Sequence, residues 1–218
     1  MKFRFSLIAA ALSLLAGAQA VQAADISIKW QGNQAQAGVA LQAYDLNLSA
    51  TEAVFDDYAL QLSYTNLTAG ASFAAFCIEP LAGNSVLATT YSVSSFTGAE
   101  ATHLAALYQT SFSSSMNATQ QAAFQLAVWE FTQEASTYGT QTGTFRATAP
   151  SAVATLADSY VTAALNYNGT STYKITKLSN GDYQDLVVAS VVPEPESYAL
   201  FLAGLGAVGL IARRRLSR

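Results

Sequence analysis

Short segments in which apolar and polar residues alternate occur on both sides of the middle of the chain, a pattern typical of half-buried β-strands. In the first half this pattern predicts strands at residues 25–30, 43–48, 58–64 and 72–78. Further along, residues 172–178 and 183–192 flank Asn180-Gly181, a dipeptide that favours a tight hairpin turn. The chain is therefore expected to contribute strands from two separate regions.

Between these regions, apolar residues recur at the three- and four-residue spacing of helices. A first helix is expected to begin at Thr97, because Thr97 and Glu100 have the spacing of a capping box. Two more helices are expected at residues 117–134, capped by Asn117, and at residues 150–167, with a Thr- and Gly-rich loop at 136–148. The order of strands, helices and strands predicts an α+β fold, a single domain with about three inserted helices.

The first 23 residues have the pattern of a secretory signal peptide. Two basic residues precede an apolar run at 7–15, and small residues follow it at the spacing of a cleavage site, after Ala20 or Ala23. These small residues argue against a retained N-terminal anchor. We therefore expect an exported protein whose body spans residues 24–191.

Three ordered elements follow at residues 192–218. They are Val192, Pro193, Glu194 and Pro195, then an apolar run at 198–212, then an arginine cluster at 213–218 that opens with Arg213, Arg214 and Arg215. Proline favours extended backbone, and arginine resists crossing a membrane. This arrangement resembles the PEP-CTERM sorting signal, which exosortases, membrane proteases of Gram-negative bacteria, process. An ordinary tail-anchor helix is the alternative, but it does not account for Val-Pro-Glu-Pro.

The apolar run at 198–212 has 15 residues, whereas a membrane-spanning helix needs about 20. Flanking arginines that snorkel to the interface make up part of the difference. The resemblance implies that an exosortase cleaves the chain near 192–195, after a transient anchoring in the inner membrane. The mature protein is then expected at the cell surface or outside the cell.

The body has four basic and twelve acidic residues, a net charge near −8. Such a body is not expected to bind nucleic acid. Its scarcity of charged residues is typical of an extracellular protein. It has a single cysteine, Cys77, which excludes a disulfide within the chain. We expect the thiol to be buried and inert, paired with another chain, or used in chemistry.

Two segments of the body stand out together. One reads Phe76-Cys77-Ile78, and the other reads Gln125-Leu126-Ala127-Val128-Trp129 on the second predicted helix. Gln125 lies on a mostly apolar face, where its amide needs hydrogen-bond partners. The two segments resemble the thioester domains of bacterial surface adhesins, which have an aromatic-Cys segment and, downstream, Gln-x-Ala-aliphatic-Trp. The chain departs from that pattern at Phe124, where the family often has threonine.

The resemblance implies an internal thioester between the Cys77 sulfur and the Gln125 side-chain carbonyl, formed with loss of ammonia. An amine or hydroxyl on a protein or polysaccharide would then open it and remain covalently attached. The expected shield against water consists of Phe76, Ile78, Val128 and Trp129. The acceptor of the thiol proton stays open, and the titratable residues nearest in sequence are Glu79, Glu130 and His103.

The alternative is a non-catalytic structural protein of an exopolysaccharide or biofilm matrix, with an inert buried Cys77 and an amphipathic helix around Trp129. No hydrolase motif or metal-ligand spacing is present, so we expect no enzyme, no metal and no cofactor. His103 is expected at the surface of the first helix. The acidic residues Asp56, Asp57, Asp182 and Asp185 are interpreted as solvated loop charges.

Overall fold

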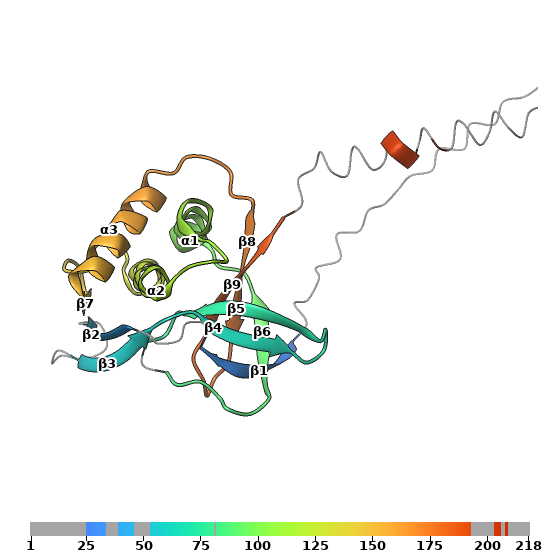
Figure 1. Ribbon diagram of the computed structural model, residues 1–218, viewed down its shortest axis with the longest axis horizontal. Coiled ribbons are helices and arrows are strands. Elements are labelled where there is room, and N and C mark those ends of the chain that lie inside the picture. Colours follow the sequence, from blue (N-terminus) through green and yellow to red (C-terminus); the bar gives the residue numbers. More distant parts are fainter. Residues whose placement is uncertain are drawn as a thin grey trace, which may run out of the picture.

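The computed structural model describes residues 25–33, 39–45, 53–80, 82–192, 203–205 and 208, and combines helices with strands, as the sequence predicts (Figure 1). The strands are β1 (Ile26–Asn33), β2 (Val39–Asp45), β3 (Ala53–Ala59), β4 (Leu62–Asn66), β5 (Ala71–Cys77), β6 (Thr89–Ser94), β7 (Phe145–Thr148), β8 (Tyr173–Ser179) and β9 (Leu186–Val191). The helices are α1 (Gly98–Ser111), α2 (Ala118–Gln133) and α3 (Ser151–Leu165).

Six of these strands form a closed antiparallel barrel in the order β1-β4-β5-β9-β8-β6. The other three form a separate antiparallel sheet in the order β3-β2-β7. Along the chain, all three helices lie between β6 and β8, which are neighbours in the barrel. The helical part of the chain therefore begins after β6 and ends before the neighbouring strand β8, and the helices gather on one side of the barrel (Figure 1).

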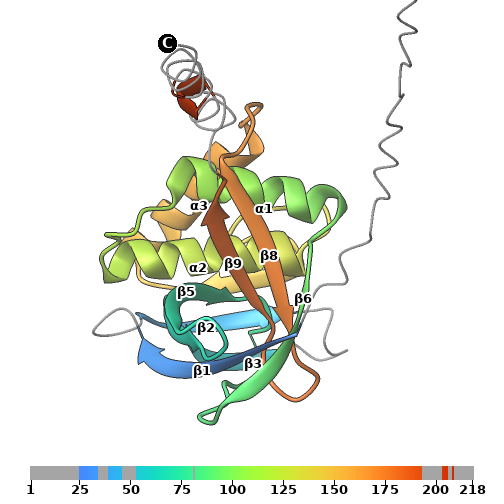
Figure 2. The same cartoon turned by 90° about the vertical axis from the view of Figure 1, so that its right-hand side faces the viewer.

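Helix α2 lies at the centre of the molecule, between the other helices and the strands (Figure 2). It contacts α1 and α3 on one side and β2, β3, β5 and β7 on the other. Residues 121–131 of this helix are all buried, as expected for a helix surrounded by protein on every face. A polar side chain on α2 must therefore find its partners inside the protein.

Strand β5 separates two hydrophobic clusters, because successive side chains of a strand point to opposite faces. Ala75 and Cys77 belong to the first cluster, which we call the barrel cluster and which also contains Tyr64, Tyr91, Leu126 and Trp129. Phe76 and Ile78 belong to the second, which we call the helix cluster and which also contains Leu104, Leu107, Phe124 and Val128. Both faces of the end of β5 are thus buried.

Several predicted strands differ from those in the structure. Segment 58–64 spans the end of β3 and the start of β4, with a break at Leu60 and Gln61. The side chains at 59–62 are all buried, so the apolar pattern runs through the break. Strand β2 ends at Asp45, earlier than expected, and β6 was not predicted. Strand β7 lies inside segment 136–148, which the sequence predicts to be a loop.

The helix starts differ in how well the capping prediction holds. At α2 the prediction is confirmed, because Asn117 Oδ1 accepts from the Gln120 N–H at 3.0 Å, and the Gln120 side chain bonds back to the Asn117 N–H. At α1 it is wrong, because Thr97 makes no side-chain cap bond. Gly98, the next residue, has a φ of 60°, outside the right-handed helical region. Glu100 is therefore not engaged in a cap.

The loop that joins β8 and β9 spans residues 180–185, so it is longer than the two-residue hairpin turn predicted from Asn180-Gly181. The Asn180 side chain accepts from the backbone N–H groups of Asp182 and Tyr183. Asp185 in this loop is 7% exposed, so its interpretation as a solvated charge is wrong. Its carboxylate is held by Lys177 at 3.0 Å and by the Asn180 N–H at 2.9 Å.

The predicted signal peptide at 1–23 lies outside the described residues. Of the predicted membrane segment at 198–212, the structure describes 203–205 and 208, which are helical. Within the described part of the chain, no helix is both long and apolar enough to cross a membrane.

Candidate functional site

Cys77 is the last residue of β5, at a point where the pairing of that strand changes. Strand β4 pairs with β5 up to Ala75, and beyond it β9 takes over, with Cys77 opposite Leu186. The Ile78 N–H donates to the carbonyl of Asp185 at 3.0 Å and so continues the contact with the β9 side. The N–H and C=O groups of Cys77 face the β4 side of β5, but β4 does not extend far enough to pair with them.

Gln125 of α2 fills this position. Its Nε2 donates to the Cys77 carbonyl at 2.8 Å, and its Oε1 accepts from the Cys77 N–H at 2.9 Å. Gln125 is 0% exposed, and these two bonds satisfy its amide in the core. The sequence indicates that Gln125 needs a partner, and the structure places the backbone of Cys77 against it.

This contact joins the two residues that the sequence motifs single out, with the side chain of Gln125 against the backbone of Cys77. Cys77 therefore supplies both the thiol and the backbone groups that bind the Gln125 carboxamide. Cys77 is 9% exposed. The N–H that binds Oε1 polarises the carbonyl and is placed to stabilise negative charge on that oxygen. The contact therefore places the residue that carries the thiol directly against the Gln125 carboxamide in the core.

The four residues expected to shield this contact divide between the two clusters. Trp129 is fully buried in the barrel cluster with Cys77, and its ring lies 6.0 Å from that of Phe145. Phe76, Ile78 and Val128 are equally buried but belong to the helix cluster, on the other face of β5. Of the four, Trp129 is thus the one in the same cluster as the Cys77 side chain.

Two tyrosines lie close to Cys77 in the barrel cluster. Burial raises the pKa of Tyr64, and the electrostatic effects of Cys77 and Tyr91 raise it further. Burial likewise raises the pKa of Tyr91 to about 12, with further contributions from Asp185 and then Cys77. Sequence reasoning missed both tyrosines as neighbours of the site, since Tyr64 was read only as a strand residue and Tyr91 lies in the unpredicted β6.

The three candidate proton acceptors have different surroundings. Glu79 follows the site directly, and its Oε2 accepts from the Asp185 N–H at 2.9 Å. Glu130 is fully buried and accepts from the Gly139 N–H at 2.9 Å, on a different loop. Burial raises the pKa of Glu130 to about 8. Glu79 is thus the candidate whose contacts lie beside the end of β5.

The third, His103, is not a surface residue as expected from the sequence. It is half-buried, and its ring packs 5.0 Å from that of Phe131 and 5.2 Å from that of Tyr138, centre to centre. Burial lowers the pKa of His103. Its contacts therefore lie in the packing between α1 and the end of α2.

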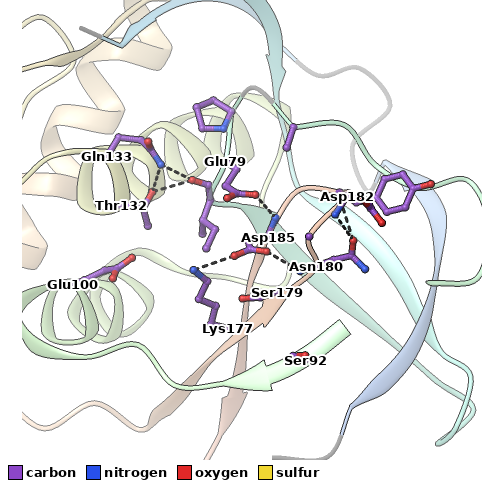
Figure 3. Close-up of a pocket in the computed structure, with 15 residues that line it drawn as sticks. Glu79, Ser92, Glu100, Thr132, Gln133, Lys177, Ser179, Asn180, Asp182 and Asp185 are labelled. Carbon is purple, nitrogen blue, oxygen red and sulfur yellow. Dashed lines mark hydrogen bonds and ion pairs between the residues drawn. The ribbon is translucent and has the colours of Figure 1, made fainter. Parts of the chain in front are cut away.

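A pocket of about 860 Å³ is lined in part by residues just after β5 and at the end of α2 (Figure 3). The segments that follow both motif residues line it, namely Ile78 and Glu79 after Cys77, and Thr132 and Gln133 two turns beyond Gln125. The Ile78 carbonyl accepts from Gln133 Nε2 at 2.6 Å and from Thr132 Oγ1 at 3.4 Å. The wall of the pocket is thereby tied to the two segments that meet at the site.

The remaining pocket residues are Pro80 and Ala82, which follow β5, and residues of α1, β6 and the β8–β9 hairpin. Four carboxylates line the pocket, from Glu79, Glu100, Asp182 and Asp185, against one lysine, Lys177. Burial raises the pKa of Glu100, and Lys177 lowers it in part. Among the described residues, no group of three or more His, Cys, Asp or Glu is placed to hold a metal ion.

Comparisons with known proteins give findings for the tail and for the body. The family described as the PEP-CTERM protein-sorting motif matches residues 191–215. None of the curated proteins matches the chain. Among solved structures, the N-terminal domain of the Streptococcus pyogenes pilus tip adhesin Cpa is similar, with a TM-score of 0.45 and 14% identity, over 74% of this chain and 99% of that one.

A second similar structure is the N-terminal thioester domain of a surface protein from Clostridium perfringens, with a TM-score of 0.41 and 11% identity, over 70% of this chain and 99% of that one. The sorting motif implies that the chain is exported and processed by an exosortase. The chain thus carries a PEP-CTERM sorting motif at residues 191–215, and the two similar structures are domains of a pilus tip adhesin and of a bacterial surface protein.

Proposed function

We propose that the body of this protein forms an internal thioester between Cys77 and Gln125, and uses it to attach covalently to a nucleophile on a partner surface. The observation that carries the proposal is the pair of hydrogen bonds between the fully buried Gln125 carboxamide and the backbone of Cys77. The polar contact lies where the motif residues Cys77 and Gln125 meet, so it supports a chemical use of both.

In the proposed formation step, the Cys77 sulfur attacks the side-chain carbon of Gln125. The developing charge on Oε1 is stabilised by the Cys77 N–H, which already donates to that atom. The carbon–nitrogen bond then breaks, the thiol proton passes to the leaving nitrogen, and ammonia departs. Because the fold holds the Gln125 carboxamide against Cys77, proximity replaces a strong catalyst in this step.

In the attachment step, an amine or hydroxyl of the partner attacks the same carbon. The carbon–sulfur bond breaks, Cys77 recovers its thiol, and the partner remains bound to Gln125 through an amide or an ester. Trp129 and the other buried side chains around the contact exclude water, which would otherwise hydrolyse the thioester. The body thus acts once rather than turning over as an enzyme does.

The sorting motif places this activity outside the cell in the proposal. Processing near Val192, Pro193, Glu194 and Pro195 releases the body from its transient membrane anchor, with Arg213, Arg214 and Arg215 on the cytoplasmic side. A neighbouring cell or a polysaccharide matrix is the proposed setting for the partner.

One observation favours a second function, that of a structural surface or matrix protein. The two hydrogen bonds satisfy the Gln125 amide without any covalent bond, so the same contact serves a purely structural purpose. In that case Cys77 is a small buried side chain of the barrel cluster. The two functions differ in whether the site reacts with an amine.

The test is treatment of the folded protein, after its processing, with methylamine, followed by peptide mapping. The thioester proposal predicts a methylamide on Gln125 and a newly alkylatable thiol on Cys77, both abolished in Cys77→Ala. Gln121→Asn is the control variant, since Gln121 is a buried glutamine of the same helix that bonds to Met116. Unmodified Gln125 in folded wild-type protein would favour the structural function.

A further inference from the structure

We propose that the membrane protease that processes the sorting motif contacts the folded body at the edge where the motif leaves it. We call this surface the exit edge. It lies where the end of α1, the start of β8 and the end of β9 meet, and it consists of Gln109, Phe112, Thr172, Tyr173, Val191 and Val192. The inference rests on the proposed processing of the tail, and it is independent of the thioester.

The sorting motif begins inside the folded body. Strand β9 ends at Val191, which pairs with Tyr173 of β8, and the matched motif begins at the same residue. The N–H of Val192 continues this pairing and donates to the carbonyl of Thr172 at 2.7 Å. The first two residues of the matched segment are therefore held by the barrel.

Helix α1 fixes the residue that holds Val192. The side-chain oxygen of Gln109 on α1 accepts from the Thr172 N–H at 2.8 Å and from the Thr172 hydroxyl at 2.9 Å. Thr172 is thus bonded to α1 on one side and to Val192 on the other, and Figure 2 shows the β8–β9 pair reaching α1 at this end. The fold therefore sets where the chain leaves the body at Val192.

The exit edge exposes apolar side chains. Val191 is 66% exposed and Val192 is 46% exposed. Because side chains alternate along a strand, Val191 lies on the same face of β9 as Val187 of the helix cluster. Tyr173 and Phe112 are half-buried next to it, with ring centres 5.9 Å apart. Exposed apolar surface that continues a buried cluster favours a contact with another protein.

The length of the chain beyond Val192 selects the occupant of this surface. Residues 193–197 separate Val192 from the apolar run at 198–212, and a fully extended chain of that length spans at most about 20 Å. A protease in the membrane that binds the motif therefore has the exit edge within reach. An anionic lipid surface fits less well, because the body has four basic and twelve acidic residues.

The first experiment moves the motif away from the exit edge. Inserting Gly-Ser-Gly-Ser-Val-Val after Val192 keeps the matched segment complete and displaces it by up to about 20 Å. Release of the full chain from the membrane fraction is followed in a bacterium that carries the exosortase, and its rate is expected to fall about fivefold. The same insert after Thr68, in the exposed turn between β4 and β5, is the control. A body that only obstructs the protease predicts faster release, so a rate equal to or above that of the wild type would overturn the inference.

A variant outside the matched segment tests the surface itself. Thr172→Arg adds a long charged side chain to the exit edge and keeps the carbonyl that holds Val192. Release is expected to slow about fivefold, because the added side chain clashes in a close interface. Thr102→Arg is the matched control, since Thr102 is an exposed threonine of α1 with its own side-chain bond to Gly98, and its effect is expected below about twofold. Equal rates in the two arginine variants contradict the contact.

Crosslinking detects the contact without cleavage and so separates this inference from the proposed processing. The full chain with Val191→p-benzoylphenylalanine is expressed together with an epitope-tagged, inactive exosortase and irradiated. A crosslink to the tagged protease is expected from this position and not from Leu87→p-benzoylphenylalanine, since Leu87 is 70% exposed in the loop before β6. Crosslinks from position 191 to lipid alone, or equal capture of the protease from both positions, would show that the exit edge is not its contact surface.

Discussion

The side-chain amide of Gln125 takes the place of a neighbouring strand for Cys77. Strand β4 pairs with β5 as far as Ala75, and beyond that point Gln125 supplies one donor and one acceptor to the Cys77 backbone, at 2.8 and 2.9 Å. This relationship joins the central helix to the barrel. It also places a carboxamide and a thiol in one buried site, so structure and proposed chemistry depend on the same contact.

Gln125→Ala is expected to destabilise the protein by about 2–4 kcal/mol, because it removes the two buried hydrogen bonds between Gln125 and the Cys77 backbone. Urea unfolding measures the change. Gln31→Ala is the control, since Gln31 is exposed on β1, and its effect is expected within about 0.5 kcal/mol. A Gln125→Ala protein as stable as the control would contradict the structural role of this contact.

Cys77→Ala is expected to fold with a loss of only about 1 kcal/mol, because the bonds from Gln125 reach the backbone of Cys77 and not its side chain. Urea unfolding and circular dichroism check this expectation. The variant therefore removes the thiol without removing the contact. Failure of Cys77→Ala to fold would show that the thiol itself holds the barrel cluster together.

Glu130 is expected to make the protein less stable as the pH rises from about 4.5 to about 8. Burial raises its pKa from 4.5 to about 8, so the folded state binds more protons than the unfolded state in this range. The stabilisation is complete below the lower value and is lost as the pH rises through the upper one.

The measurement is the unfolding free energy of the wild type and Glu130→Gln across this range. Glu130→Gln is expected to flatten the profile, because an amide does not titrate. Asp25→Asn, at an exposed position that does not contribute to the pKa of Glu130, serves as the control and should retain the wild-type slope. A wild-type profile that is already flat would show that Glu130 is ionised in the folded protein.

His103 is the single histidine of the chain, so its NMR signal is unambiguous. Burial between the rings of Phe131 and Tyr138 lowers its pKa, and its titration midpoint is expected below the ordinary value of 6.5. Tyr138→Ala exposes the imidazole and should move the midpoint towards that value. A midpoint above 6.5 in the wild type would indicate an anionic partner rather than burial.

Local patterns predicted the elements that carry their own signals. The capping residues Asn117 and Gln120 mark the start of α2, and alternation marks most of β1, β5, β8 and β9. Strand β7 carried no such signal, because its four residues alternate only briefly within a Thr- and Gly-rich segment. The break between β3 and β4 was hidden because burial by α2 keeps that turn apolar; the Gln61 N–H there bonds to Gln121.

For the site, sequence reasoning identified Cys77 and Gln125 but not how they meet. The two residues are 48 positions apart, and their contact depends on α2 crossing the end of β5, which no local pattern contains. The same holds for Tyr91 and for the pocket, whose residues come from five different parts of the chain. Glu100 illustrates the limit, since a residue expected in a helix cap lines the pocket instead.

The intact mass of the folded, processed body before any treatment tests the central claim most directly. The account predicts a mass lower by one ammonia than the mass calculated from the amino-acid sequence. Cys77→Ala is expected to have the mass calculated from its own sequence. A full mass in the folded wild-type protein, together with a Cys77 thiol that is alkylated after unfolding, would contradict the thioester.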